Sequence, residues 1–347
     1  MNTNYKQIYQ KITKELSPKI KSIFERRFGM KTGRPETLES IGKSLGITRE
    51  RVRQIEEAGF NHIRKNHKEI LDAVFADFDA YFKERGGIKK EDALLEEIGG
   101  KKQKPYVLFF LTIGEQFTKV AEKRDYHSFW SNLPQPQEKA KETLNSFISQ
   151  IQEIGKPISL KDFYLKTAQK HGLSERVIAS FLEISKKIQL TGEKKLGLAE
   201  WPEIKPRGVK DKAFLVFKKY GKPLHFTEVA RLIDKLNYNA ASQMGKTHPQ
   251  TVHNELIKDP RFVLVGRGTY ALAEWGYVPG TVRDIIIKIL KEKNEPLHKD
   301  EIVKQVLAQR LVERNTVLMN LNDKTIFEKD QKERYFLRET KDKTQTA

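Results

Sequence analysis

The spacing of apolar residues near the start of the chain predicts two short helices joined by a tight turn. Before the turn, apolar residues recur at helical spacing at Leu38, Ile41 and Leu45. Gly46 and Ile47 then interrupt the pattern. Thr48 can cap a second helix beginning at Arg49, because a threonine hydroxyl accepts a bond from a free amide at a helix start. The pattern therefore predicts a helix-turn-helix over residues 37–65.

The second of these helices is expected to present a polar face to solvent. Val52 and Ile55 fall at core spacing, which leaves four polar residues outward, namely Arg49, Glu50, Arg53 and Gln54. These side chains suit the major groove of duplex DNA, because Arg can grip guanine, Gln can grip adenine and Glu can accept from cytosine. The alternative is the solvated face of a structural helical bundle. We take base contact as the leading hypothesis.

Beyond this segment, one pattern recurs four times along the chain. Each repeat opens with an amphipathic helix, at residues 69–84, 138–154, 209–220 and 281–293. A short apolar connection follows, then two more helices, and then two β-prone stretches separated by a turn, such as RFVLV-GRG-TYALAEW at residues 261–275. Three helices followed by a β-hairpin predict a winged helix in each repeat.

The predicted fold class is mainly α with small β-hairpins, that is, α+β. Segments that contain Pro and Gly mark the expected domain boundaries. They separate an N-terminal helix-turn-helix from the tandem winged helices that follow it. The helix-turn-helix is expected over residues 1–67, and the winged helices over 68–133, 138–204, 207–279 and 280–340. Residues 341–347 are expected to form a disordered tail.

The three tryptophans mark the ends of predicted hairpins, at Trp130, Trp201 and Trp275. We expect them to pack each hairpin onto its helices, and base stacking is the alternative. In the fourth repeat no tryptophan follows the last strand, and Leu337 aligns with Leu272 of the third.

The composition favours a polyanionic partner. Sixty-five Lys and Arg against 46 Asp and Glu give a formal net charge of +19, although a well-solvated lysine-rich surface explains such charge equally well. The chain contains no cysteine, which excludes disulfides, thiolate metal sites and cysteine nucleophiles. No apolar run approaches membrane-spanning length, and the first residues lack the apolar core of a signal peptide. We therefore expect a cytoplasmic protein with no membrane partner.

The strings RRFG at 26–29, TLESIG at 37–42 and TRERVRQIEEAG at 48–59 resemble region four of the principal bacterial sigma factors. The resemblance covers residues 16–66 and implies binding to the upstream promoter hexamer. It also implies that the segment before the helix-turn-helix contacts the flap of the RNA polymerase beta subunit. A separate promoter-melting domain, which sigma factors also carry, has no counterpart in this sequence.

Carried onto this sequence, the resemblance assigns roles to particular residues. It implies base contacts for Arg49, Glu50, Arg53 and Gln54, and DNA contacts also for Thr48 and for Arg51, which would lie nearer phosphate. Arg26, Arg27 and Phe28 become candidate polymerase contacts. For the two arginines, contact with phosphate or polymerase and simple exposure to solvent are equally good readings of the sequence.

The strings GKPLHFTEVARLI and RFVLVGRGTYALAEWGY, within residues 221–277, are similar to the HARE-type helix-turn-helix domain. That winged helix also occurs in the delta subunit of RNA polymerase of Gram-positive bacteria and is fused to some restriction enzymes. Residues 246–258 are expected to form its third helix, with Val252 and Leu256 inward and with an outward face of Gln250, His253 and Asn254. Arg267 lies at the hairpin tip and is a candidate DNA contact, although a plain turn that needs glycine explains the tip equally well.

The histidines do not form a metal site by their spacing. His225 and His298 follow Pro-Leu in two repeats, which favours a recurring capping or packing role. His248 and His253 are five residues apart, so they do not share one helical face, and no Cys or acidic cluster completes a ligand set. No Walker loop, nucleophile elbow or HExxH motif occurs. We expect no enzyme, no cofactor, no metal and no small-molecule ligand.

These observations predict a DNA-binding transcription regulator whose partners are promoter-like double-stranded DNA and the bacterial RNA polymerase core. One alternative is a polymerase-binding scaffold that does not read DNA sequence. Another is an accessory DNA-binding component of a restriction or defence system.

Overall fold

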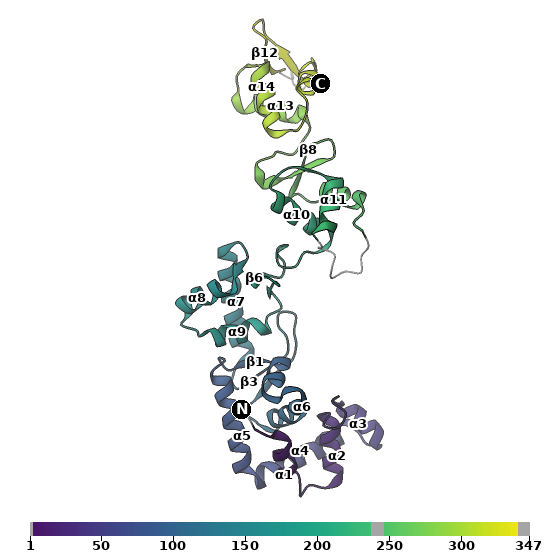
Figure 1. The fold of residues 1–347 in the computed structure, drawn as a ribbon, viewed down its shortest axis with the longest axis vertical. Helices are drawn as coiled ribbons and strands as arrows, with labels where there is room; N and C mark the ends of the chain where they lie inside the picture. Colours follow the sequence, from purple (N-terminus) through teal and green to yellow (C-terminus); the bar gives the residue numbers. More distant parts are fainter. Residues whose placement is uncertain (1–2, 237–245, 339–347) are drawn as a thin grey trace, which may run out of the picture. The chain divides into compact units, whose positions relative to one another are not determined.

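The computed structural model describes residues 3–236 and 246–338. The chain divides into two units, residues 1–204 and residues 205–347 (Figure 1). Both units are mainly helical with small antiparallel sheets, so the predicted α+β class is confirmed. The tail expected at 341–347 lies outside the described residues.

The chain begins with four helices, each started by a side-chain cap. They are α1 (Tyr5–Ile12), α2 (Pro18–Arg27), α3 (Leu38–Leu45) and α4 (Arg49–Asn66). Gly46 ends α3 in the left-handed region, at φ 67°, which glycine adopts without strain. The Oγ1 of Thr48 then accepts a bond from the amide of Arg51 and starts α4. The predicted helix-turn-helix is confirmed.

A small core holds the two helices of this motif together. Ile23 of α2, Ile41 of α3 and Val52 of α4 are fully buried there. Leu45 was expected on the same apolar stripe, but it is 39% exposed. It lies in the last turn of a short helix, where little of the core remains to cover it.

The first repeat follows directly. It consists of α5 (Lys68–Lys83), β1 (Ile88–Lys90), α6 (Glu91–Ile113), β2 (Thr118–Val120) and β3 (Phe129–Ser131). Gly100, at φ 53° and ψ −162°, breaks α6 into two helical parts. These parts correspond to the expected second and third helices.

The second repeat completes residues 1–204 and has the same order of elements. It consists of α7 (Pro136–Ile154), β4 (Ile158–Ser159), α8 (Leu160–His171), α9 (Glu175–Ile184), β5 (Ile188–Leu190) and β6 (Lys195–Leu198).

Residues 205–347 contain the other two repeats. The third has α10 (Gly208–Tyr220), β7 (Leu224–His225), α11 (Phe226–Lys235), α12 (Pro249–Lys258), β8 (Phe262–Gly266), β9 (Thr269–Leu272) and η1 (Ala273–Trp275). The fourth has α13 (Val282–Lys293), β10 (Leu297–His298), α14 (Lys299–Gln309), α15 (Arg314–Leu321), β11 (Phe327–Lys329) and β12 (Arg334–Leu337).

Each described repeat has a three-stranded antiparallel sheet. The connection after the first helix is a short strand that pairs with the last strand, so the spatial orders are β1-β3-β2, β4-β6-β5, β7-β9-β8 and β10-β12-β11. The register places Leu272 opposite Phe262 and Leu337 opposite Phe327. The alignment of Leu337 with Leu272 is therefore confirmed.

One hydrophobic core runs across residue 67, where a boundary was expected. It joins residues of α1, α2 and α4 to residues of α5 and α6. Trp130 of β3 belongs to this core, whereas its neighbour Phe129 belongs to the core of the second repeat. The helix-turn-helix and the first repeat therefore share one interior, and β3 separates that interior from the next.

The tryptophans pack as structural residues. Trp130 is 4% exposed, and Trp201 packs against the core of the second repeat. Trp275 meets Phe217 of α10 with ring centroids 6.2 Å apart. The expected packing role is confirmed for these three residues.

Within residues 205–347, hydrogen bonds join the third repeat to the fourth. The guanidinium of Arg310 is buried and donates to the carbonyl oxygens of Val278, at 2.5 Å, and Gly280, at 2.7 Å. The amide of Leu311 donates to the carbonyl oxygen of Val265 in β8 at 2.7 Å.

Candidate nucleic-acid interface

The polar face expected on α4 is exposed in the structure. Val52 is fully buried and fixes the rotation of the helix, and Ile55 is partly buried beside it. The outward residues are all exposed, namely Arg49, Glu50, Arg51, Arg53 and Gln54. Thr48, also exposed, caps the helix start beneath them. The first two turns of α4 thus offer guanidinium, carboxylate and amide groups on one solvent-facing surface.

These side chains bond to one another along the helix. Arg53 Nη2 lies 2.8 Å from Glu50 Oε1, and Arg51 Nη1 donates to Gln54 Oε1 at 3.1 Å. Both pairs have the i, i+3 spacing that brings side chains together on a helix surface. The hydrogen bond from Arg53 lowers the pKa of Glu50, so this carboxylate stays ionised near neutral pH.

Two glycines bring the supporting helices close to α4. A Cβ on Gly59 of α4 would lie 2.6 Å from Ile20 Cγ2 and 2.7 Å from Phe24 Cζ. A Cβ on Gly42 of α3 would lie 2.7 Å from the carbonyl oxygen of Ile47. Gly59 therefore sets how closely α2 approaches α4, and Gly42 sets how closely α3 approaches the turn.

A buried carboxylate lies under the polar face of α4. Glu56 is 8% exposed, and its Oε1 has no hydrogen-bond partner among the described residues. Burial raises the pKa of Glu56, and Arg27, with Nε 3.6 Å away, opposes that rise.

The candidate polymerase contacts lie in different environments. Arg26 binds Glu36 with two bonds, at 2.9 and 2.6 Å, and these bonds raise the pKa of Arg26 and lower that of Glu36. Arg27 Nη1 donates to the carbonyl oxygen of Glu36 at 3.0 Å. Phe28 is only 4% exposed. A direct partner contact by Phe28 is therefore corrected to a packing role, because its ring has no open face.

The apolar side of the helix-turn-helix is covered by α6 of the same chain. The ring of Phe109 lies 5.0 Å from Tyr9, 5.2 Å from Phe24, 5.3 Å from Phe28 and 5.7 Å from Phe60, measured between centroids. All five rings are buried. Sequence reasoning missed this contact, although the continuous apolar run in residues 106–111 is typical of a helix buried on more than one side.

The third helix of the third repeat is shorter than expected and differs in one side chain. It begins at Pro249, not at residue 246, because His248 caps it. Val252 and Leu256 face inward as predicted, and Gln250 and Asn254 are exposed.

His253 was expected to face outward with those two residues, but it is half-buried. Its ring lies 4.7 Å from that of Phe226, and its Nδ1 lies 3.1 Å from Tyr270 Oη. Arg267 is exposed in the two-residue turn between β8 and β9, and Gly268 beside it has φ +67°.

The recurring histidines are helix caps. The Nδ1 atoms of His225 and His298 accept bonds from the amides of Thr227 and Asp300, each at 3.4 Å. The predicted capping role is confirmed. Across residues 3–236 and 246–338, no group of three or more His, Cys, Asp or Glu side chains could hold a metal ion.

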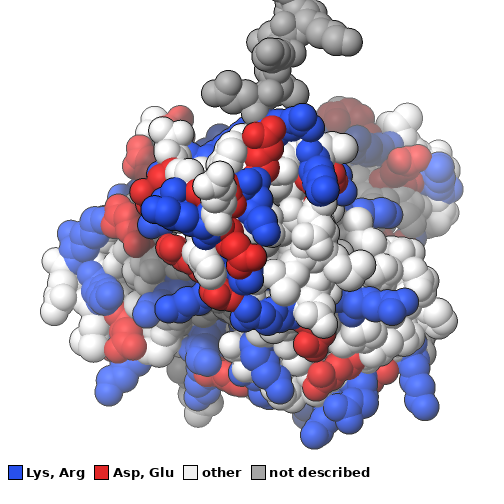
Figure 2. All heavy atoms as spheres, turned by 90° about the horizontal axis from the view of Figure 1, so that it is seen from above, with Lys and Arg blue, Asp and Glu red and all other residues white. Residues whose placement is uncertain are grey.

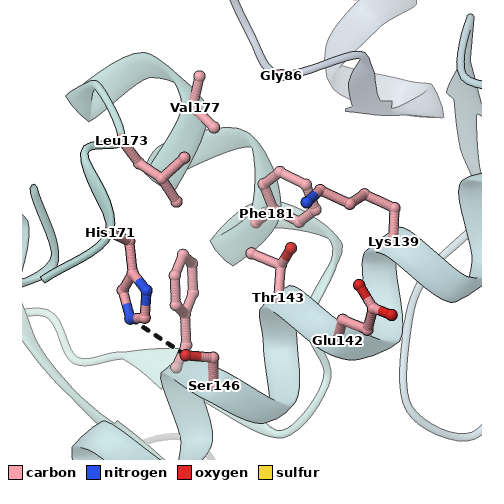
Figure 3. Close-up of a pocket in the computed structure, with 10 residues that line it drawn as sticks. Gly86, Lys139, Glu142, Thr143, Ser146, His171, Leu173, Val177 and Phe181 are labelled. Carbon is pink, nitrogen blue, oxygen red and sulfur yellow. Dashed lines mark hydrogen bonds between the residues drawn. The ribbon is translucent and has the colours of Figure 1, made fainter.

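A cavity of about 370 Å³ lies within residues 1–204 (Figure 3). Figure 3 shows that α7 contributes Lys139, Glu142, Thr143 and Ser146, with His171 opposite. Ser146 Oγ lies 3.1 Å from His171 Nε2. In the part of the chain that the structure describes, no carboxylate bonds the other nitrogen of this ring, so the pair lacks the group that orients a catalytic histidine.

Positive charge is concentrated in two segments of the chain. Residues 1–67 contain 15 Lys and Arg against 7 Asp and Glu, and residues 205–279 contain 13 against 6. Residues 68–204 are nearly balanced, with 22 against 21. The face in Figure 2 shows Lys and Arg interspersed with Asp and Glu.

None of the described helices is long and apolar enough to cross a bilayer.

Comparisons with known proteins match the two basic segments. Residues 14–65 match the family model of sigma-70 region 4. Residues 207–275 match the HARE-HTH model, a helix-turn-helix domain whose description names ASXL and restriction endonucleases. Both resemblances expected from the sequence are confirmed: one segment similar to sigma-70 region 4 and one similar to the HARE-type helix-turn-helix lie in the same chain.

Curated relatives match over short segments. The chain is 42% identical over 66 residues to RNA polymerase sigma factor sigB of Arabidopsis thaliana, covering 18% of this chain and 12% of that protein. It is 41% identical over 59 residues to RNA polymerase principal sigma factor HrdC of Streptomyces coelicolor, covering 16% and 17%. RNA polymerase sigma factor SigA of Clostridium acetobutylicum is 40% identical over 67 residues, covering 18% of each. The chain thus spans less than a fifth of the length of these relatives.

Proposed function

We propose that this chain is a DNA-binding transcription regulator that reads promoter-like double-stranded DNA through the exposed face of α4. The observation that carries the proposal is the exposed set of Arg49, Glu50, Arg53 and Gln54 on the second helix of a helix-turn-helix. The match of residues 14–65 to sigma-70 region 4 supports it. The positive charge of residues 1–67 supports a polyanionic partner.

Base reading requires these side chains to exchange partners. Arg53 must leave Glu50 to grip a guanine, and Gln54 must leave Arg51 to grip an adenine. Exchange is easy because both pairs are exposed to solvent, and exposed pairs are weak and screened by salt. Each bidentate base contact contributes about 1–3 kcal/mol of discrimination. The free amides at the start of α4 also favour a nearby phosphate.

We propose the core RNA polymerase as a second partner, because the relatives of residues 14–65 are named as RNA polymerase sigma factors. Arg26 and Arg27 are the candidate contacts. Since α1 and α6 cover the apolar side of the helix-turn-helix, this contact would be mainly polar. Phe28 would support it only from the interior.

The test is selection of bound duplexes from a random pool by the full chain, with and without core polymerase. The proposal predicts enrichment of a short sequence motif, which should be lost in the variant with Arg53→Ala and Gln54→Ala. Lys19→Ala, at an exposed position on α2, removes the same charge and should leave the motif unchanged. No motif under either condition, together with stable capture of polymerase, would favour a scaffold and overturn the DNA-reading proposal.

A further inference from the structure

The first repeat meets the second in a tight contact with α9. A Cβ on Gly86 of the first repeat would lie 2.7 Å from Val177 Cγ1 and 3.3 Å from Phe181 Cε2. Glu183 of α9 also binds the buried Nζ of Lys89 at 2.8 Å. The cavity of about 370 Å³ shown in Figure 3 lies beside this contact and is called here the α7 pocket. Its walls come from both repeats, so it is formed once the two repeats have packed together.

The floor of the α7 pocket is apolar. It consists of Phe147, Leu173, Val177 and Phe181. The two rings are buried and pack edge to face, with centroids 6.4 Å apart, whereas Leu173 and Val177 are partly buried. Such a floor favours an apolar ring or a branched chain over water. The volume lies in the range of about 300–1,000 Å³ that is typical of small-molecule sites, and it is too small for a duplex or a folded partner.

The rim of the α7 pocket carries one cation and one anion on neighbouring turns of α7. Lys139 and Glu142 are exposed lining residues, and their i, i+3 spacing would allow an ion pair. They do not form one, and neither charged group has an ion pair or hydrogen bond with any residue that the structure describes. Figure 3 shows the Lys139 side chain extended toward Phe181. The rim therefore offers two opposite charges that the protein itself does not neutralise.

Hydroxyl groups and a histidine complete the rim. Thr143 and Ser146 continue along α7, and His171 lies opposite them (Figure 3). Ser146 Oγ and His171 Nε2 are 3.1 Å apart and hold each other in place. Polar groups that converge above an apolar floor are typical of a site that orients the polar end of a small ligand.

We propose that the α7 pocket binds a free α-amino acid with a bulky apolar side chain. Glu142 pairs with the ammonium group of the ligand, Lys139 pairs with its carboxylate, and its side chain lies on the apolar floor. A ligand with a single charge would leave one rim charge unpaired and bring a like charge toward it. The inference does not depend on DNA binding. Sequence reasoning expected no small-molecule ligand, because the lining residues are spread over residues 86–181 and form no local motif.

A set of matched ligands tests the class of molecule. L-phenylalanine and L-leucine are titrated into the full chain, and binding is followed by nuclear magnetic resonance. Phenylpropionate is phenylalanine without the ammonium group, and phenethylamine is phenylalanine without the carboxylate. Each should bind about 3- to 10-fold more weakly than L-phenylalanine, the loss expected for one charged contact at an exposed rim. Equal affinity for either analogue would overturn the proposal, as would the absence of saturable binding of both amino acids at millimolar concentrations.

Substitutions at the rim test the assignment of the two charges. Lys139→Ala should weaken L-phenylalanine by about 3- to 10-fold without weakening phenethylamine, because only the amino acid has a carboxylate. Glu142→Gln should weaken L-phenylalanine to the same extent without weakening phenylpropionate, which has no ammonium group. An equal loss for L-phenylalanine and the analogue would overturn the assignment.

The matched controls are Lys141→Ala and Glu138→Gln, which remove the same charges at exposed positions of α7 outside the pocket. Both should leave the affinity for L-phenylalanine unchanged. A loss in a control as large as that in its rim variant would show a general charge effect and overturn the proposal. All four substituted residues are exposed, so unchanged thermal unfolding should confirm the fold of each variant.

Discussion

Substitution of Phe109 by alanine should loosen α4, the helix proposed to read DNA, from a distance, because this ring joins α6 to the helix-turn-helix. Phe109 is fully buried and contacts the rings of Tyr9, Phe24, Phe28 and Phe60. Removing a buried phenylalanine ring from a packed core costs about 3–5 kcal/mol, since the lost transfer energy and the remaining cavity add. Four aromatic neighbours place the expected cost at the upper end of that range.

The assay is amide hydrogen exchange of the full chain, followed segment by segment. If the helix-turn-helix and the first repeat open together, a loss of about 3–5 kcal/mol lowers protection in α4 by about 100- to 4,000-fold. The matched control is Phe217→Ala, which removes a fully buried ring from the third repeat and should leave protection in α4 unchanged. Protection in α4 that survives Phe109→Ala while α6 loses its own would refute the shared core.

Three further predictions concern stability. Gly59→Ala should destabilise residues 1–204 by about 1–3 kcal/mol through overpacking against Ile20 and Phe24, whereas Gly192→Ala, where nothing lies within 4 Å of the added carbon, should be close to neutral in thermal unfolding. Because the pKa of Glu56 is raised in the folded state, the cost of its buried charge is fully present above the folded pKa and disappears as pH falls below the ordinary value of 4.5. Glu56→Gln should therefore raise stability relative to wild type most at neutral pH, and a pH-independent difference in denaturant titrations would contradict this. Arg310→Met should cost about 1.5–3 kcal/mol by removing charged hydrogen bonds to the carbonyls of Val278 and Gly280, while loss of the exposed Arg314 and its pairing with Asp300 should cost at most about 1 kcal/mol in the same assay.

The local features of this fold could be predicted from the sequence because their causes are local. Thr48 marks the start of α4 by its capping hydroxyl, and Gly46 marks the turn by its left-handed backbone. The shared position of His225 and His298 after Pro-Leu predicted a recurring capping or packing role, and both residues cap a helix. In each case the determining interaction lies within a few residues of the motif.

Features that depend on distant contacts could not be predicted in the same way. The strands β4, β7 and β10 are two residues long, too short for an alternating pattern to appear. His253 follows the buried Val252 on α12, and helical phase alone did not show that Phe226 and Tyr270 would cover it. The resemblance assigned Phe28 to a partner, and nothing in its own segment indicates that the ring of Phe109, far along the chain, packs against it.

The same long-range contact determines whether the helix-turn-helix can fold without the first repeat. The sigma-like match ends at residue 65, yet the apolar side of that segment is covered by α6, which begins at residue 91. A chain cut at residue 67 would expose the rings of Tyr9, Phe24, Phe28 and Phe60 together, an apolar patch that favours aggregation. The first repeat therefore completes the interior of the helix-turn-helix. Its third helix, the second part of α6, therefore packs inside the molecule, whereas α12 of the third repeat keeps Gln250 and Asn254 exposed.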